Sequence, residues 1–326
     1  MNHTRRTLLG AAGASTVAGL LPLHAFAQGW PSKPIRFVVP FAPGGSSEII
    51  ARSAAAEMAK TLGQSVFVDN KPGASGNIAM AEVARAEDQH TVILGHIGTL
   101  AVNPYMYEKL PYDANKDFKP VSLLAKVPSL YVVNPSVPAK DLKEFIALAK
   151  AKPDTLNYGS AGNGSAGHLA MEYLKMTADI SLAHIPYKGT GPQLTDLLAG
   201  RLQAASVGAS AIIQHIKAGK LRCIATGSAQ RLPQLPDVPT VAEQGFPGFE
   251  MTQWYGMLAP ASMAQANIDR LAVEAQKAMK SQGALERLNQ DAAQSVGGSP
   301  AQFAQFIASE QKRWKQVVDR AKIKAE

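Results

Sequence analysis

Short apolar runs alternate with amphipathic segments along most of the chain. Ile35–Val39 is a compact apolar run that ends at Pro40, which is typical of a strand. Residues 48–62 follow with apolar side chains at helical spacing, and Gly63 stops this predicted helix. The alternation predicts further strands at 65–68, 91–95, 129–133, 156–159, 181–185, 202–206, 221–226 and 254–259, and helices at 77–86, 141–150, 168–175, 192–199, 215–218 and from 268 to about 321. An α/β fold with mostly parallel strands follows.

The predicted elements fall into two sets with the same order of strand, glycine loop and helix. The first set has its most conspicuous glycine loop at residues 41–48, and the second has one at residues 158–165. No short repeat of the solenoid type is present. We therefore expect two α/β lobes with a ligand cleft between them.

Both glycine loops lead from a predicted strand into a predicted helix. A helix start offers unpaired backbone N–H groups and the positive end of a dipole, which together hold a small anion. One such loop is explained equally well by a tight turn, but two in equivalent positions favour a shared anion site. The candidate residues are Phe41, Ala42, Pro43, Gly44, Gly45, Ser46, Ser47 and Glu48 in the first loop, and Ser160, Ala161, Gly162, Asn163, Gly164 and Ser165 in the second.

Two histidines lie close to these loops in the predicted topology. His96 ends a strand that faces the same cleft, so both a ligand contact and a structural role remain open. His168 opens the helix after the second loop and is either a brace of that loop or a neighbour of the ligand. The histidines show no spacing typical of metal ligands, so we expect neither a metal nor a cofactor.

Motifs for catalysis and nucleotide binding are missing from the sequence. There is no phosphate-binding G-x-x-x-x-G-K-[ST] motif, and the glycines of the second loop reverse the dinucleotide spacing. Residues 164–167 are one residue short of a G-x-S-x-G nucleophile elbow. We therefore expect a binding protein, with an exported hydrolase of carboxylate esters or amides as the less favoured alternative.

Composition and charge agree with a globular binding protein. The chain is 46% hydrophobic and 18% charged, which argues against disorder. Its formal charge of +8 falls by two without residues 1–27, and this mild excess weakly favours anionic ligands. The basic residues are scattered, so nucleic acid is excluded as a partner. The single cysteine, Cys223, lies in an apolar run and is expected to be a buried strand residue.

Residues 1–27 have the organisation of an export signal. Arg5 and Arg6 precede an apolar run, and residues 25–27 form an A-x-A cleavage motif, so cleavage is expected between Ala27 and Gln28. The arginine pair favours the twin-arginine route, with an ordinary secretory signal as the alternative. The mature protein is therefore expected in the periplasm.

A series of ordered motifs resembles the Bug-type receptors, the periplasmic solute-binding components of tripartite tricarboxylate transporters. The matching stretches cover essentially the whole mature chain: residues 30–36, 39–45, 70–74, 110–113, 116–118, 156–165, 185–189, 215–222 and 235–240. The resemblance implies a two-lobed Venus-flytrap fold of type II-like topology. It also implies that the chain crosses between the lobes near Lys126 and Glu250, so that lobe 1 comprises 28–126 and 251–326 and lobe 2 comprises 127–250.

The same resemblance implies how a ligand is held and which partners receive it. In the family, the two loops bind one ligand carboxylate through backbone N–H groups and ordered water. A monomer is expected, working with membrane permease subunits or, alternatively, docking on a sensor kinase.

Three departures from the family pattern concern the rest of the ligand. Glu48 replaces a common Asp, Gly208 replaces an Asp that could pair with an amino group, and His96 replaces a small residue.

The loss of an acidic group at position 208 argues against an amino acid ligand. A histidine at position 96 would suit a second carboxylate or an aromatic acid. We therefore expect a di- or tricarboxylate or an aromatic acid, selected by His96, Glu48, Thr99, Tyr187 and the segment around Gly208.

Overall fold

The computed structural model describes residues 29–321, so the export signal predicted at 1–27 lies outside the described residues. From Pro31 onward, these residues form one compact unit. The strands are β1 (Ile35–Val39), β2 (Val66–Asn70), β3 (Thr91–His96), β4 (Phe118–Val133), β5 (Asn157–Ser160), β6 (Ala183–Pro186), β7 (Ala204–Gly208), β8 (Arg222–Thr226), β9 (Thr252–Pro260) and β10 (Gln294–Ser295). The α-helices are α1 (Ser46–Leu62), α2 (Asn77–Ala84), α3 (Asn103–Met106), α4 (Leu142–Ala151), α5 (Ala166–Ala178), α6 (Thr190–Leu198), α7 (Ala209–Lys217), α8 (Gln265–Lys280), α9 (Gln282–Gln290) and α10 (Pro300–Ala321). Short turns of other helix types occupy η1 (Ala74–Gly76) and η2 (Gly98–Val102).

The sheet is parallel at its two ends and antiparallel in its centre. Its strand order is β2-β1-β3-β9-β4-β7-β5-β6, and β8 and β10 also pair with β4. The pairs β1–β2, β1–β3, β5–β6 and β5–β7 are parallel, whereas β9 and β4 run antiparallel to every strand they pair with. The prediction of mostly parallel strands was therefore wrong for the centre. It missed the first part of β4 because Lys119, Ser122 and Lys126 interrupt the apolar pattern there.

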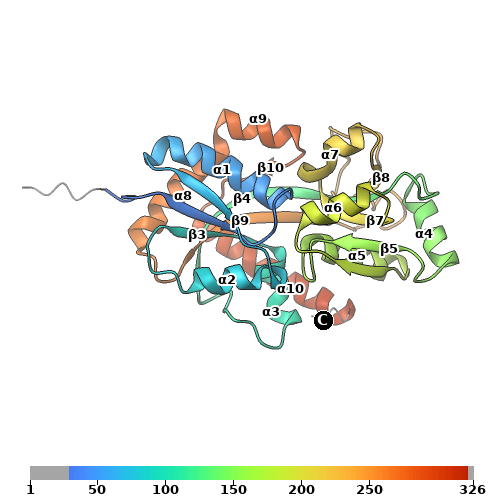
Figure 1. Ribbon diagram of the computed structural model, residues 1–326, viewed down its shortest axis with the longest axis horizontal. Helices are drawn as coiled ribbons and strands as arrows, with labels where there is room; N and C mark the ends of the chain where they lie inside the picture. The colour runs from blue at the N-terminus through green and yellow to red at the C-terminus, as the bar shows by residue number, and fades with distance from the viewer. Residues whose placement is uncertain (1–28, 322–326) are drawn as a thin grey trace, which may run out of the picture. The chain divides into compact units, whose positions relative to one another are not determined.

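Two long strands are shared by both halves of the sheet. β4 pairs with β9 from Phe118 to Pro128, and then pairs with β7 from Ser129 to Val133. Figure 1 shows β4 and β9 running side by side from the half with β1–β3 to the half with β5–β8. This arrangement confirms the two-lobed α/β fold. The lobe boundaries at 126/127 and 250/251 stay a prediction, and the change of strand partner lies close to them.

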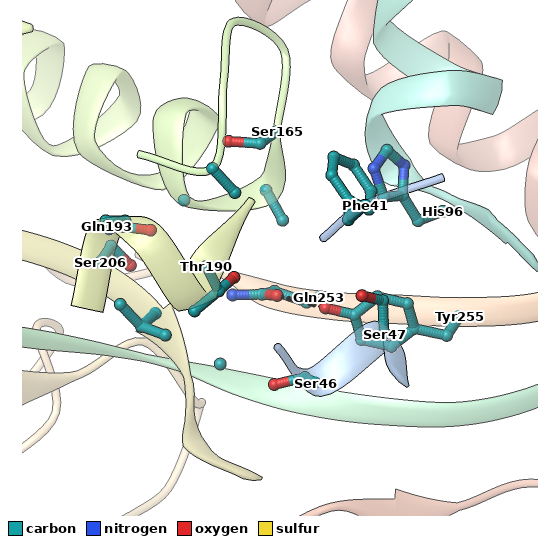
Figure 2. A pocket seen from close by; sticks show the side chains of 15 residues that line it. Phe41, Ser46, Ser47, His96, Ser165, Thr190, Gln193, Ser206, Gln253 and Tyr255 are labelled. Carbon is teal, nitrogen blue, oxygen red and sulfur yellow. Dashed lines mark hydrogen bonds between the residues drawn. The ribbon is translucent and has the colours of Figure 1, made fainter. Parts of the chain in front are cut away.

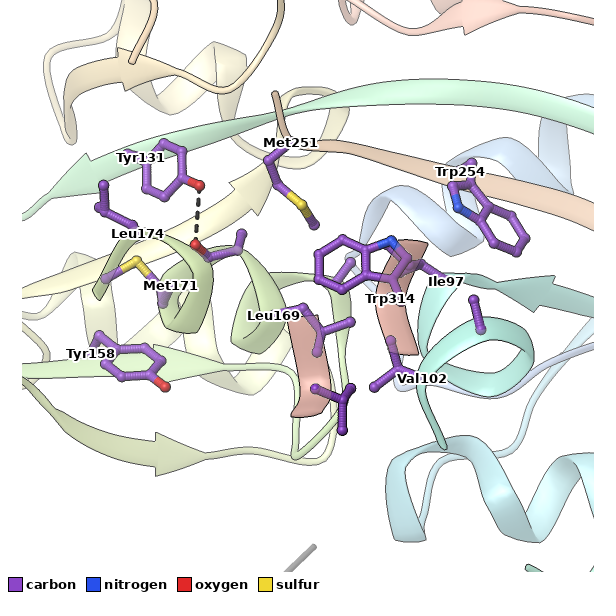
Figure 3. Packing of buried hydrophobic residues seen from close by; sticks show 14 of the residues in the cluster. Ile97, Val102, Tyr131, Tyr158, Leu169, Met171, Leu174, Met251, Trp254 and Trp314 are labelled. Carbon is purple, nitrogen blue, oxygen red and sulfur yellow. Dashed lines mark hydrogen bonds between the residues drawn. The ribbon is translucent and has the colours of Figure 1, made fainter. Parts of the chain in front are cut away.

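Helix α10 packs against the shared strand β9 through two tryptophans and one carboxylate. Trp254 and Trp314 are each only 1% exposed, and both indole N–H groups donate to Glu310 Oε2, at 2.7 and 3.2 Å. The Trp314 ring also meets Tyr173 of α5 edge-on, with 6.5 Å between ring centroids. Figure 3 shows Trp314 between Leu169 and Trp254. The C-terminal helix thus contacts elements of both lobes.

Cys223 lies in β8, as predicted, although it is half-buried rather than fully buried. Burial raises the pKa of its thiol to about 12, so the thiol stays protonated at neutral pH.

Within the described residues, no helix combines the length and apolarity needed to cross a bilayer.

Candidate functional site

The first glycine loop joins β1 to α1 and ends in a helix N-terminus without a side-chain cap. Gly44 has a φ of +94°, a conformation that favours glycine, and Gly45 is the N-cap residue. The Glu48 carboxylate accepts a hydrogen bond from Gly44 N at 2.8 Å and pairs with Arg52 at 2.7 Å. Glu48 is thus engaged within the first turns of α1 rather than in the cavity described below.

The second glycine loop joins β5 to α5 and is fixed by side chains on both sides. Ser165 caps α5 and accepts from His168 N at 3.3 Å. In return, Gly164 N donates to His168 Nδ1 at 3.1 Å. Gly162 N donates to Ser160 Oγ at 3.1 Å, which closes the start of the loop. The loop is thereby held in shape by residues of its own strand and helix.

His168 is a neutral brace behind this loop. Its ring stacks on that of His184, with 4.3 Å between ring centroids. Burial, assisted by the neighbouring His184, lowers the pKa of His168 to about 3. Because Nδ1 accepts the Gly164 N–H, the ring has to stay unprotonated at this nitrogen. The first of the two roles predicted for His168, a brace of the loop, is the one that the contacts support.

The first glycine loop lies against the segment that begins α6. Ala42 N of the first loop donates to Lys188 O at 3.3 Å. Gly191 lies so close to the first loop that a Cβ built on it would be 2.4 Å from Pro43 O. Glycine is therefore required at position 191 for this approach.

A small cavity of about 30 Å³ lies where these elements meet. Figure 2 shows Phe41 and His96 on one side and Ser165 on the facing side, with Gln253 below them in this view. None of the residues that line the cavity is an Asp, Glu, Lys or Arg. The lining residues are Phe41, Ser46, Ser47, His96, Ala161, Ser165, Ala166, Gly167, Thr190, Gln193, Ser206, Val207, Gly208, Gln253 and Tyr255.

Four helices begin at this cavity. The N-cap residues of α1, α5, α6 and α7 are Gly45, Ser165, Gly189 and Gly208, and each of these helices contributes a residue of its first turn or its N-cap to the lining. Each helix N-terminus carries a partial positive charge and unpaired N–H groups. Together they make the cavity electropositive without any charged side chain.

Several polar atoms of the lining are buried without a hydrogen-bond partner. They are His96 Nε2 and Ser206 Oγ, and also Ser46 Oγ, which lies near the Tyr255 hydroxyl without a well-formed hydrogen bond. A buried polar group without a partner costs about 1–3 kcal/mol. Polar atoms that surround a cavity in this way are those that a bound ligand or water would satisfy.

The predicted site residues fall into two groups. Phe41, Ser46, Ser47, His96, Ala161, Ser165 and Gly208 line the cavity, whereas Ala42, Pro43, Gly44, Gly45, Glu48, Thr99, Ser160, Gly162, Asn163, Gly164, His168 and Tyr187 do not. Of this second group, Thr99 contacts His96, and the Tyr187 hydroxyl donates to Asp196 Oδ2 at 2.7 Å.

Sequence reasoning missed the polar lining residues that come from β7, β9 and α6. Gln253 and Tyr255 lie on β9, Ser206 on β7, and Thr190 and Gln193 on α6. A usable signal was present for β9, because Gln253 is a polar residue within an otherwise apolar strand. Ser206 and Gln193 carried no comparable signal.

The fold and the paired loops define the class of two-lobed solute-binding proteins. The solved periplasmic binding protein BugD covers 91% of this chain with its entire length, at a TM-score of 0.88 and 32% identity. An R. palustris protein, Rpa4515 with adipate, matches 90% of this chain and 99% of its own, with a TM-score of 0.87 and 35% identity. MatC from Rhodopseudomonas palustris with bound malate matches 88% and 99%, with a TM-score of 0.85 and 34% identity.

Family and relatives agree with this class. Residues 50–323 match the tripartite tricarboxylate transporter family receptor, and the chain belongs to this family. It is 35% identical to Protein BugT of Bordetella pertussis over 320 residues, which cover 98% of both chains. It is also 37% identical to a UPF0065 protein of Pseudomonas sp. strain P51 over 325 residues, which cover 98% of this chain and 95% of the relative. The predicted Bug-type family is confirmed.

Proposed function

We propose that this protein is a periplasmic receptor that captures a small organic carboxylate between its lobes and delivers it to the membrane subunits of a tripartite transporter. The observation that carries this proposal is the small cavity at four helix N-termini, lined by uncharged residues that include several hydrogen-bond donors. Such a site favours an anion without a fixed counter-charge. Relatives whose structures hold adipate and malate support a carboxylate as the ligand class.

Capture requires the lobes to separate and close again. A cavity of about 30 Å³ holds no more than one or two water molecules, which is far less than a dicarboxylate needs. We infer that the lobes have to stand further apart than in this structure when a ligand enters and is held. A ligand that contacts loops of both lobes stabilises the closed population.

The second glycine loop also contains a serine–histidine contact, which is the kind of pair that a hydrolase would need. Ser160 Oγ lies 2.7 Å from His184 Nε2, but Ser160 is 0% exposed and does not line the cavity. A nucleophile has to reach its substrate. This pair supports the second loop rather than a hydrolytic reaction.

A thermal-shift screen of mono-, di- and tricarboxylates, with mass spectrometry of the recovered ligand, tests the proposal. Ligands that bind the folded state raise the melting temperature by mass action and should be recovered unchanged. Ser165→Ala should reduce both stability and binding. Ser281→Ala is the matched control, since Ser281 caps α9 by accepting from Ala284 N at 3.2 Å, away from the cavity. A conversion product, or binding that both variants weaken equally, would contradict the proposal.

We further propose export through the signal in residues 1–27. Replacing Arg5 and Arg6 together by lysine should leave the protein in the cytoplasm if the twin-arginine route is used. Cell fractionation measures the outcome, and unchanged export of the double variant would assign the ordinary secretory route.

A further inference from the structure

His96 is buried at the cavity, and only one of its two ring nitrogens has a hydrogen-bond partner. The residue is 2% exposed, and its ring stacks on Phe41 with 4.7 Å between ring centroids. Thr99 N donates to His96 Nδ1 at 3.0 Å, whereas His96 Nε2 has no hydrogen-bond partner. The stack and the Thr99 contact hold the ring in one orientation.

The Thr99 contact also determines where the imidazole carries its proton. A backbone N–H can only donate, so His96 Nδ1 has to be the accepting, unprotonated nitrogen. In a neutral ring, the single proton is then on Nε2. Burial lowers the pKa of His96 to about 4, which agrees with a neutral ring at neutral pH. His96 therefore offers one N–H donor, and it has no free nitrogen that could accept.

We propose that His96 selects ligands with a second hydrogen-bond acceptor, by donating from Nε2–H to an oxygen of the ligand other than the carboxylate held at the glycine loops. This inference rests on the proposed carboxylate-binding function and names the part of the ligand that His96 recognises. A second carboxylate oxygen provides such an acceptor. An ammonium group does not, because it would meet a donor and leave both groups unsatisfied.

Gly208 supports this selectivity from the other lobe. A Cβ built at Gly208 would lie 2.3 Å from Ser46 Oγ and 3.2 Å from Gln253 Oε1, so a side chain there would have to displace the Ser46 hydroxyl. The cavity lining includes no carboxylate at this position or elsewhere. The cavity thus presents donors to the ligand and no anionic partner for an ammonium group.

The test compares ligand pairs in which a methyl group replaces the second carboxylate. Adipate with hexanoate, and succinate with butyrate, are titrated calorimetrically into the wild type and into His96→Phe, which keeps an aromatic ring beside Phe41. A hydrogen bond to a charged acceptor corresponds to roughly a 10- to 100-fold difference in affinity. We expect the wild type to prefer at least one dicarboxylate by that factor, and His96→Phe to lose the preference.

Two further variants separate recognition from stability. His90→Phe is the matched control, because His90 is also buried in the first lobe, at 6% exposed, but does not line the cavity. It should keep the wild-type preference. His96→Gln places an amide donor near the position of Nε2 and should restore part of the preference if His96→Phe fails to fold.

Three outcomes are distinguishable. Loss of the preference for the dicarboxylate in His96→Phe alone supports the inference. Equal weakening of both members of a ligand pair, or an unchanged preference, overturns the role of His96 and leaves carboxylate binding intact. If none of these acids binds the wild type, both the proposed function and this inference are contradicted.

Discussion

At the scale of single residues, the two buried histidines next to the cavity make stability depend on pH. The pKa values of His96 and His168 are lowered to about 4 and about 3, against 6.5 for an ordinary histidine. The charged and titratable groups around His168 are His184, Glu172 and Lys175. Below pH 6.5, the unfolded chain takes up protons that the folded protein does not, so stability falls with falling pH.

Between pH 7 and pH 5.5, each of these histidines should lower the free energy of unfolding by about 1 kcal/mol. Denaturant unfolding at the two pH values measures the loss. In His168→Gln, the pH-dependent loss should shrink by about half. A loss of the same size in wild type and variant would contradict this assignment.

Gly208 permits a second test at the same scale. Gly208→Asp puts a carboxylate against Ser46 Oγ and Gln253 Oε1, and it adds a negative charge at the start of α7 inside the cavity. The added negative charge would repel the ligand carboxylate, and the added side chain would overlap with Ser46. Together these effects should weaken binding of any carboxylate by at least about 10-fold. Calorimetry measures this, and retained affinity would place the ligand elsewhere.

Residue types alone picked out about half of the residues that line the cavity. Phe41, Ser46, Ser165 and His96 could be predicted because glycine loops and strand ends mark the start of a helix in the sequence. Glu48, predicted as a ligand contact, does not line the cavity, because a carboxylate in the first turn can reach back to its own loop N–H, and here it does so to Gly44. Sequence position does not distinguish this local contact from a contact with a ligand.

At the scale of elements, the attachment of α10 depends on one buried carboxylate. Glu310→Ala would leave the indole N–H groups of Trp254 and Trp314 without an acceptor. The expected cost is about 2–4 kcal/mol in the free energy of unfolding. Glu310→Gln keeps an acceptor and should cost less.

Chemical denaturation of both variants measures these costs. Glu286→Ala is a matched control, because this exposed helical glutamate bonds only to Gln282 among the hydrogen bonds described. An equal effect of Glu286→Ala and Glu310→Ala would show that general loss of helix propensity is responsible.

The alternation of strands and helices could be read from the apolar pattern, but the centre of the sheet could not. Strand pairing joins residues far apart in sequence, such as Lys126 with Trp254, and no local pattern encodes such a partner. The direction of β9 relative to β3 likewise depends on the path of the intervening chain.

At the scale of the whole molecule, closure should depend on Gly191, which lets the start of α6 approach the first glycine loop. Gly191→Ala would bring a Cβ to 2.4 Å from Pro43 O and should hold the lobes slightly apart. We expect ligand affinity to fall by about 10-fold, which is typical of the strain from one added methyl group. Small-angle scattering should show a smaller ligand-induced decrease in the radius of gyration.

The control for this variant is Gly298→Ala, since the nearest atoms to a Cβ built there are 3.8 Å away. It should bind and close like the wild type. Unchanged closure in Gly191→Ala would mean that the approach of α6 to the first glycine loop does not limit ligand capture.

The uncharged lining of the cavity has a consequence for the conditions under which this receptor works. Mobile ions screen exposed charges within about 10 Å at 0.1 M salt, but they screen enclosed dipoles much less. A ligand held by backbone N–H groups and neutral side chains should therefore keep nearly the same dissociation constant in dilute and in saline media. Titrations across ionic strength measure this directly. In a compartment whose salt concentration varies with that of the surroundings, the occupancy of such a receptor would depend on the ligand concentration and hardly on the salt concentration.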